Sequence, residues 1–441
     1  MPDPTHLAET FDVAELAAAA AALRLDDVPE PVRRHAATVL ADTVGVIMGG
    51  ARRPEIAALV ASDDLDATPP GGAQILAPGL PRAEAARAAF VNATAGTFLE
   101  LDEGYRPTGH PAVHVVPAAL AAAQSLHRSG RELLAAVLSG YEVTARLFEA
   151  FGLRYPLHPH GHFGAIGAAV AVARLRCAPP GPPARIAGTL PLLSLWQPCY
   201  EGATARNAYA GVAAAIGIVA NRLASAGFTG SRAALPTAFG ELVGEPRRPE
   251  SLHEPVRPDR LRILGDYLKL HSACALSHAA LDAVLQLRPD PAEVESIEVE
   301  TVSNNLKLDR QAADNDLSTR FSLPYAVAAA VIKGHSRPEA FRPDPAVADL
   351  ARRVSVRPAP DLEPLWPACA PARVTVRGRS GVRTARVDNP RGHHANPATP
   401  EELREKFLML SWAGDGARLH RRLLDLESCP DCAGLFSDLE G

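Results

Sequence analysis

The chain has 441 residues, of which 47% are hydrophobic and 22% are charged, and its formal net charge at pH 7 is -5. This size and composition indicate a globular protein of two or three domains. The weakly acidic charge argues against nucleic-acid binding, and the sequence contains no run of about 18 apolar residues that would predict a membrane span. Because the N-terminus shows no secretion signal, we expect a cytoplasmic protein.

Helical patterns dominate the first part of the chain. Residues 14 to 23 are mostly alanine and leucine, and residues 29 to 48 end at a glycine pair, so both segments are predicted to be helices. Ser129 and Glu132 have the spacing of a capping box, and the apolar residues after them recur on one helical face. These patterns predict a mostly helical N-terminal domain.

Residues 100 to 111 interrupt the helical patterns with a polar loop. The loop contains three carboxylates, an arginine and His110, between helical patterns at residues 84 to 99 and 117 to 128. Acids and imidazoles on a loop held by rigid helices suit proton transfer, which requires groups that titrate near neutral pH and are accurately placed. A solvated, well-capped loop is the alternative interpretation.

Three histidines form a second polar cluster, at His158, His160 and His162, ahead of a helix of small residues. A proline and a glycine between them spoil the helical spacing of a metal site, and no carboxylate accompanies them, so we predict no metal there. The glycines before the helix suit the binding of an anion, and a surface turn is the alternative. The lone Cys429-Pro-Asp-Cys432 pair is also predicted to bind no metal.

A third cluster begins at Lys269. Cys274, His278 and Asp282 follow at intervals of four residues, which would place them on one face of a helix. Such a face could carry a nucleophile with its base. More often such a face is a packed helix end with a satisfied histidine, which is the interpretation we favour.

Alternating apolar and polar residues indicate strands in the second half of the chain, at residues 296 to 302, 353 to 357, 373 to 377 and 382 to 387. Thr399 and Glu402 then form a capping box that opens another helix. We therefore predict a discontinuous helical domain, residues 1 to 264 and 396 to 441, and an α/β domain at residues 265 to 395. The C-terminal helices are expected to pack on the N-terminal ones.

The three clusters, together with the segment Arg320-Phe-Ser-Leu-Pro-Tyr325 and residues 389 to 400, resemble the MmgE/PrpD family. Its members include 2-methylcitrate dehydratase, cis-aconitate decarboxylase and iminodisuccinate epimerase. The resemblance implies a mostly α fold, with a large discontinuous all-helical domain and a smaller inserted α/β lid domain. It also implies a homodimer whose site lies at the domain junction and needs neither a metal nor an organic cofactor.

Carried over residue by residue, the resemblance predicts the catalytic residues Asp102, His110, His158 and Lys269, and the substrate-binding residues Glu100, Gly104, Arg206, Cys274 and Tyr325. Three of these positions depart from the family pattern. Gly104 stands where related enzymes commonly have threonine, Arg206 where they have lysine, and Cys274 at a position that is otherwise polar. These departures predict an altered substrate.

The family members share the task of forming a carbanion next to a carboxylate. Arg206 and Lys269 suit the binding of that carboxylate, and His110 is the best candidate acid or base, because imidazole titrates near pH 6.5. His158 could bind a second carboxylate or protonate a leaving hydroxyl.

The sequence thus predicts a cofactor-independent lyase that dehydrates a small hydroxy-polycarboxylate. The first alternative is an epimerase or decarboxylase of a related di- or tricarboxylate, and the second is a non-catalytic binding protein of the same fold.

Overall fold

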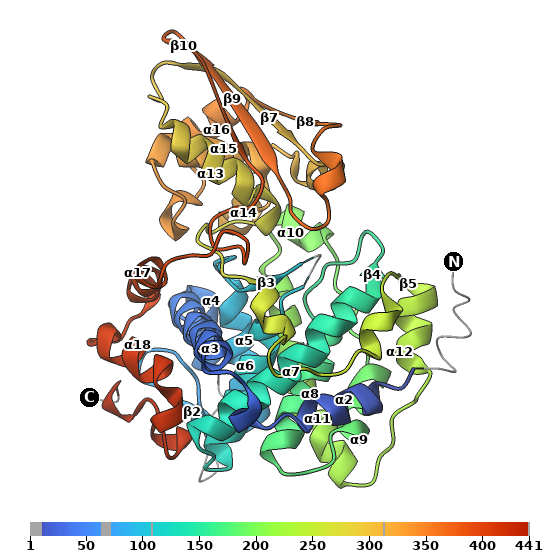
Figure 1. Ribbon diagram of the computed structural model, residues 1–441. Coiled ribbons are helices and arrows are strands. Elements are labelled where there is room, and N and C mark those ends of the chain that lie inside the picture. Colours follow the sequence, from blue (N-terminus) through green and yellow to red (C-terminus); the bar gives the residue numbers. More distant parts are fainter. Residues whose placement is uncertain (1–10, 63–71, 107–108, 312–313, 440–441) are drawn as a thin grey trace.

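The computed structural model describes residues 11–62, 72–106, 109–311 and 314–439, and it has a large helical part and a smaller α/β part (Figure 1). The main helices of the helical part are α2 (Val13–Ala21), α3 (Glu30–Gly50), α4 (Pro54–Val60), α5 (Ala85–Thr97), α6 (Pro111–Ser125), α7 (Gly130–Ala150), α8 (His162–Leu175), α9 (Gly181–Thr189), α10 (Gln197–Glu201), α11 (Ala208–Ser225) and α12 (Ala234–Pro236). The predicted fold class, a helical domain plus an α/β domain, is confirmed.

Small residues allow the helices around α8 to approach closely. α8 packs against α6, α7, α9 and α11. A Cβ atom at Gly164 would lie 2.2 Å from the His114 ring, and one at Gly167 would lie 1.9 Å from the Thr144 hydroxyl. Both distances are far shorter than van der Waals contact, so glycine at these two positions is required by the packing of α8 on α6 and α7.

One described helix, Thr204–Ser225, is long and apolar enough to cross a membrane, and 44% of its apolar window is buried inside the structure. Its regular part, α11, packs against α5, α8 and α9. These contacts are those of a core helix in a globular protein.

The α/β part is a four-stranded sheet covered by helices. The strands have the order β10-β9-β7-β8; β7 and β8 are parallel and the other pairs are antiparallel. Its elements are α13 (His278–Leu287), β7 (Val294–Thr301), α14 (Asp316–Arg320), α15 (Leu323–Lys333), α16 (Pro345–Ala351), β8 (Val354–Pro358), β9 (Ala372–Gly378) and β10 (Gly381–Val387). α13 packs on β9 and β10, and α15 packs on β8. The four strands predicted from alternation are all present.

Short strand pairs tie the loops of the helical part together. Their strands are β1 (Ala73–Gln74), β2 (Arg82–Ala83), β3 (Gly104–Tyr105), β4 (Phe151–Leu153), β5 (Gly244–Pro246) and β6 (Asp266–Tyr267). The antiparallel pair β3–β6 aligns Gly104 with Tyr267. This pairing holds the acidic loop next to the segment that carries Lys269, although the two are far apart in the sequence.

The C-terminal helices α17 (Pro400–Leu410) and α18 (Gly416–Leu424) pack on α3, and Figure 1 shows them beside the N-terminal helices. The predicted capping box of Thr399 and Glu402 opens α17. Lys406 of α17 is buried, and its ammonium group lies 2.8 Å from Asp42 of α3 and 3.0 Å from the Leu101 carbonyl. The C-terminal helix therefore also fixes the beginning of the acidic loop.

Two predicted helix boundaries are wrong. α6 begins at Pro111, not near residue 117, because proline is well suited to the first helical position; His110 is consequently the N-cap residue. α13 begins at His278, so Cys274 precedes the helix and does not share a helical face with Asp282. His271 binds Asp282 at 2.9 Å, which makes that carboxylate part of the packing of the α/β part.

Removing the Lys406 ammonium group should destabilise the fold strongly, because Asp42 would remain buried without its cation. We expect Lys406→Met to lower the free energy of unfolding by about 3–5 kcal/mol. The double variant Asp42→Leu/Lys406→Met should lose less, and Lys333→Met, which breaks a partly exposed pair with Asp344, should lose about 1 kcal/mol or less. Denaturant titration measures all three, and a Lys406→Met protein as stable as the wild type would contradict the expectation.

Candidate active site

A cavity lies where the acidic loop meets residues of the α/β part. Six of the nine predicted site residues line the cavity: Glu100, Gly104, His110, His158, Lys269 and Cys274. Asp102 and Arg206 contact these residues from behind the wall, and Tyr325 lies elsewhere. The structure thus brings eight of the nine predicted residues together.

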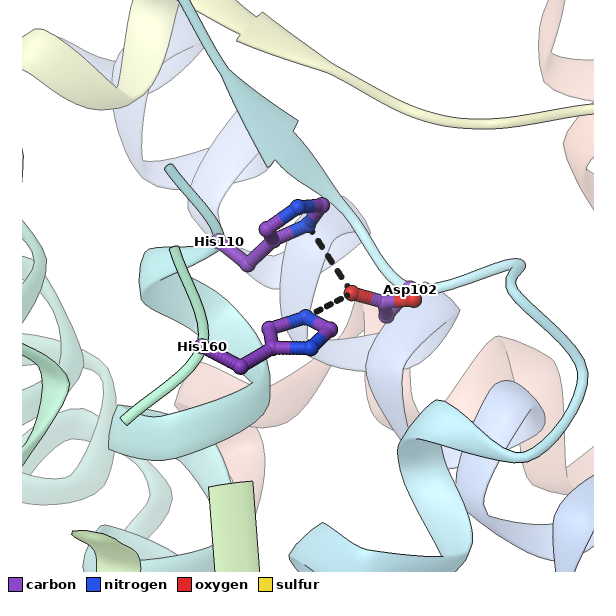
Figure 2. Close-up of side chains that lie close together, drawn as sticks. All are labelled: Asp102, His110 and His160. Atoms are coloured by element: carbon purple, nitrogen blue, oxygen red, sulfur yellow. Dashed lines mark hydrogen bonds and ion pairs between the residues drawn. The ribbon is translucent and has the colours of Figure 1, made fainter. Parts of the chain in front are cut away.

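Asp102 is the centre of the polar network, and Figure 2 shows it between two histidine rings. Its Oδ2 atom lies 2.9 Å from His110 Nδ1 and 3.0 Å from His160 Nε2, and its Oδ1 atom accepts a hydrogen bond of 3.2 Å from Lys269 Nζ. The carboxylate is 2% exposed. Burial alone would raise the pKa of Asp102, but Lys269, His110 and His160 hold this pKa well below its usual value. Asp102 is therefore a buried anion stabilised by three nitrogen groups.

The surroundings of His110 determine which ring nitrogen carries the proton. Nδ1 lies 2.7 Å from the Glu103 carbonyl oxygen as well as 2.9 Å from Asp102. Both neighbours are acceptors, so Nδ1 must be the N–H donor. Nε2 is left to gain or lose a proton, and the side chain lines the cavity. This is the arrangement that a general acid or base requires.

His160 is held in the opposite tautomer. Its Nδ1 atom lies 3.2 Å from an Nη2 donor of Arg206, and its Nε2 atom donates to Asp102. Because arginine can only donate, Nδ1 must accept and the ring is neutral. Burial, with the charge of His110 as the next cause, holds the pKa of His160 well below its usual value. His160 therefore links Arg206 to Asp102 and orients the carboxylate.

His158 faces only donors in this network. One ring nitrogen lies 3.2 Å from Arg206 Nη2, and the other lies 3.2 Å from the backbone N–H of His160. Burial, followed by the charge of Arg206, holds the pKa of His158 well below its usual value. The predicted role of His158 as a proton donor to a leaving hydroxyl therefore conflicts with its surroundings, since the ring is kept neutral. A neutral imidazole keeps one N–H and can therefore accept only one of these two hydrogen bonds, which leaves its N–H for an acceptor on a substrate, because the side chain lines the cavity.

Two cations neutralise the two buried acids. Arg206 Nη1 lies 2.6 Å from Glu100 Oε1, and Lys269 Nζ lies between Asp102, at 3.2 Å, and Glu100, at 3.8 Å. Burial alone would lower the pKa of Lys269, but the charges of Asp102 and Glu100 raise it. Lys269 is therefore an ammonium ion and not a base. Glu100 adopts a left-handed backbone conformation, with φ of 52°, which is unusual outside glycine. Such conformations cluster at functional sites.

Arg206 does not occupy the position predicted for it. Its guanidinium group is buried behind the cavity wall, where its Nη atoms donate to Asn207 and the two histidines and form an ion pair with Glu100. The planar group contacts several acceptors at once, as arginine can and lysine cannot. Arg206 is thus a residue that positions the histidines, and direct pairing with a substrate carboxylate is not supported by the geometry.

Tyr325 is the predicted substrate-binding residue that lies away from the cavity. Its hydroxyl donates to the Arg342 carbonyl at 2.6 Å and accepts from the Asp344 amide at 3.0 Å. The ring packs in the core of the α/β part. Because both hydrogen-bonding functions of the phenol are used there, the geometry gives no support to a role in substrate binding.

The sequence interpretation missed several residues of the site. His160 stands in the histidine cluster that was noted, but the tight turn to Gly161, with φ of 103°, was needed to aim it at Asp102. Arg106, Asn304 and Lys307 also line the cavity. Arg106 was visible in the acidic loop, whereas Asn304 and Lys307 lie in a 3-10 helix, Ser303–Leu308, for which the sequence carried no recognisable signal.

Asp102, His110 and His160 also form a group whose ligand atoms lie within 4.8 Å of one another, close enough to hold a metal ion. A metal would need the lone pair of His110 Nδ1. That nitrogen instead faces the Glu103 carbonyl at 2.7 Å, which requires a proton on it. The donor set therefore fits a hydrogen-bonded carboxylate better than a metal centre.

The cavity and its polar network lie at the junction of a helical and an α/β part. The model of the MmgE/PrpD N-terminal domain matches residues 14–243, and that of the MmgE/PrpD C-terminal domain matches residues 271–429. The chain therefore belongs to the MmgE/PrpD family, as its motifs indicated, and it is a lyase.

Two similar proteins are cis-aconitate decarboxylases. The chain is 26% identical to the one from Mus musculus over 354 residues, which cover 73% of this chain and 70% of that protein. It is 27% identical to the one from Homo sapiens over 390 residues, which cover 80% of this chain and 79% of that protein.

Acid should destabilise the protein through its buried histidines. Burial lowers the pKa of His114 and of His162 to about 4. The unfolded chain binds protons below about pH 6.5, whereas the folded chain does so only near pH 4, so stability rises with pH between these values and is constant above them. The free energy of unfolding should fall by about 1.4 kcal/mol per such histidine between about pH 7.5 and 5.5.

Denaturant titration at the two pH values measures this fall. In His162→Gln this fall in unfolding free energy should be smaller by the contribution of one histidine. The surface variant His335→Gln should show the same fall as the wild type. An unfolding free energy that is the same at both pH values would contradict the prediction.

Metal should be dispensable for the site, because Lys269, Arg106 and Lys307 line the cavity and can supply the positive charge that a carboxylate substrate needs. We expect elemental analysis of the purified protein to find no stoichiometric zinc or iron, and chelation to leave activity unchanged. Activity that is lost on chelation and restored by one equivalent of metal would overturn this prediction.

Proposed function

We propose that the protein is a cofactor-independent lyase that forms a carbanion next to a carboxylate of a small polycarboxylate, and that its net reaction is decarboxylation. The observation that carries this proposal is the His110 imidazole, whose Nδ1 is fixed by Glu103 and Asp102 while the ring lines the cavity. One proton-transfer group beside one fixed ammonium ion is what such a reaction needs.

The proposed chemistry uses groups that are already in place. Lys269 binds and neutralises a carboxylate of the substrate, and this lowers the energy of negative charge on the adjacent carbon. The bond to the departing carboxylate breaks, its electron pair stays on that carbon, and carbon dioxide leaves. Protonated His110 then delivers its Nε2 proton to the carbanion, while Asp102 and the Glu103 carbonyl hold Nδ1 and keep the ring oriented.

Decarboxylation is favoured over the dehydration expected from the sequence by two observations. A dehydration needs one group to remove the proton and an acid for the leaving hydroxyl, but His158 faces only donors and Lys269 is bound to Asp102. The similar proteins are cis-aconitate decarboxylases. Dehydration is the second candidate, with His110 both removing the proton and returning it to the hydroxyl.

Three changes in the cavity bear on the choice of acid. Gly104 presents no hydroxyl to a substrate, Cys274 presents a buried thiol whose pKa is raised by burial to about 11, and Arg206 is turned away from the cavity. We therefore propose an acid related to cis-aconitate and 2-methylcitrate, with weak or no turnover of these two. The homodimer implied by the family resemblance and the cytoplasmic location remain predictions.

Replacing His110 should abolish turnover without unfolding the protein. We expect His110→Gln to lose about a hundredfold to ten-thousandfold in rate, because a positioned acid or base contributes this much. A panel of di- and tricarboxylic acids is incubated with enzyme in heavy water, and the products are followed by NMR. Decarboxylation predicts carbon dioxide release and one solvent deuterium in the product.

The control for this test is His335→Gln, at a surface position, which should keep wild-type rates. Lys269→Ala is a poorer probe than His110→Gln, since it leaves Asp102 buried without its ammonium partner and should destabilise the fold. Near-full activity of His110→Gln on the substrate that the panel identifies would reject the mechanism, and neither turnover nor deuterium exchange across the panel would reject the proposed function.

A further inference from the structure

The cavity wall contains two cations that form no ion pair with an acid among the described residues. Asp102 and Glu100 offset the charges of Lys269 and Arg206. Arg106 and Lys307 also line the cavity, and within the described part of the chain neither forms an ion pair. The cavity therefore has two positive charges in excess.

Arg106 comes from the acidic loop, directly after β3. Two of its guanidinium nitrogens, Nε and Nη2, are buried and have no hydrogen-bond partner among the described residues. The carbon atom of its guanidinium group lies 5.8 Å from the centre of the Tyr267 ring. Burial lowers the pKa of Arg106, which shows that its charge is poorly solvated there. Buried unpaired donors are rare in native proteins, so they call for a ligand or another explanation.

Lys307 and Asn304 come from the opposite side, in the 3-10 helix of the α/β part. The Lys307 ammonium lies 4.8 Å from the centre of the Trp196 ring, and Asn304 Nδ2 is buried without a hydrogen-bond acceptor in the described residues. Burial also lowers the pKa of Lys307. Donors from both parts of the chain thus line one cavity, where no acid of the described residues pairs with them.

We propose that Arg106, Lys307 and Asn304 bind the carboxylates of the substrate that do not react, so that the enzyme selects acids with at least two carboxylates. Arginine binds a carboxylate through two parallel N–H groups, whereas lysine acts as a point charge. Because the donors belong to the helical part and to the α/β part, the bound acid would also join the two parts across the cavity. The inference rests on the proposed function only in taking the bound anion to be the substrate.

Binding measurements test this without requiring turnover. Calorimetry compares tricarballylate, succinate and propionate, which carry three, two and one carboxylates, on wild type, Arg106→Gln and Lys307→Gln. We expect affinity to fall in that order for the wild type. Each variant should bind tricarballylate roughly tenfold to hundredfold more weakly, the loss expected for one charged hydrogen bond, and should bind propionate within about threefold of the wild type.

Two further variants separate recognition from folding. Arg106→Lys should recover part of the affinity for tricarballylate, and Arg352→Gln, which removes an exposed cation paired with Asp349, should bind like the wild type. Because two buried guanidinium nitrogens of Arg106 have no hydrogen-bond partner among the described residues, Arg106→Gln should leave the unliganded melting temperature unchanged or raise it. If Arg106 were needed for folding, Arg106→Gln would lower the melting temperature.

The inference is overturned if wild-type protein does not bind tricarballylate at millimolar concentration, or if both variants keep wild-type affinity. It is also overturned if they weaken propionate and tricarballylate equally, or if Arg106→Gln lowers the melting temperature. If polycarboxylates bind as described but none exchanges a proton or loses carbon dioxide, the proposed function fails and this inference stands.

Discussion

The burial of the Asp102 carboxylate is the constraint on which the site depends. A carboxylate removed from water is stable only when donors replace its solvation, and here Lys269, His110 and His160 do so. Each donor is fixed in turn, because each has only one proton arrangement that satisfies all its neighbours. A single buried charge therefore sets the tautomers of two histidines and the charge of a lysine.

The fold supplies these donors from distant parts of the sequence. The β3–β6 pair brings the segment that carries Lys269 to the acidic loop, and close packing of glycine-containing α8 on α6 places the histidine turn beside it. The C-terminal helix adds Lys406, which binds both Asp42 and the Leu101 carbonyl. Glu103 uses its carboxylate for the α6 N-terminus and for Tyr141, while its carbonyl holds His110. The loop is thus held at each end by a different element.

Local sequence patterns were sufficient to predict the parts of the fold that depend on interactions between residues close in the sequence. Capping boxes and strand alternation placed α7, α17 and the four main strands, and the density of acids and histidines found the loop. Properties that depend on tertiary contacts could not be predicted from local sequence patterns. The side-chain direction of Arg206, the neutral state of His158 and the distance of Tyr325 from the cavity all depend on partners that are remote in the sequence. Lys307 was missed for the same reason, since a lysine in a short 3-10 helix resembles any surface lysine until the cavity is known.

The central claim is that Asp102 and the Glu103 carbonyl fix the proton of His110 on Nδ1, and it can be tested directly by ¹⁵N NMR of protein labelled at histidine. Comparison with His110→Gln assigns the His110 signals, and the shifts of the two ring nitrogens identify the tautomer. Nδ1 should appear protonated at every pH at which the protein is folded, and Asp102→Asn should remove this preference. A neutral His110 that carries its proton on Nε2, or a tautomer that does not change in Asp102→Asn, would contradict the account.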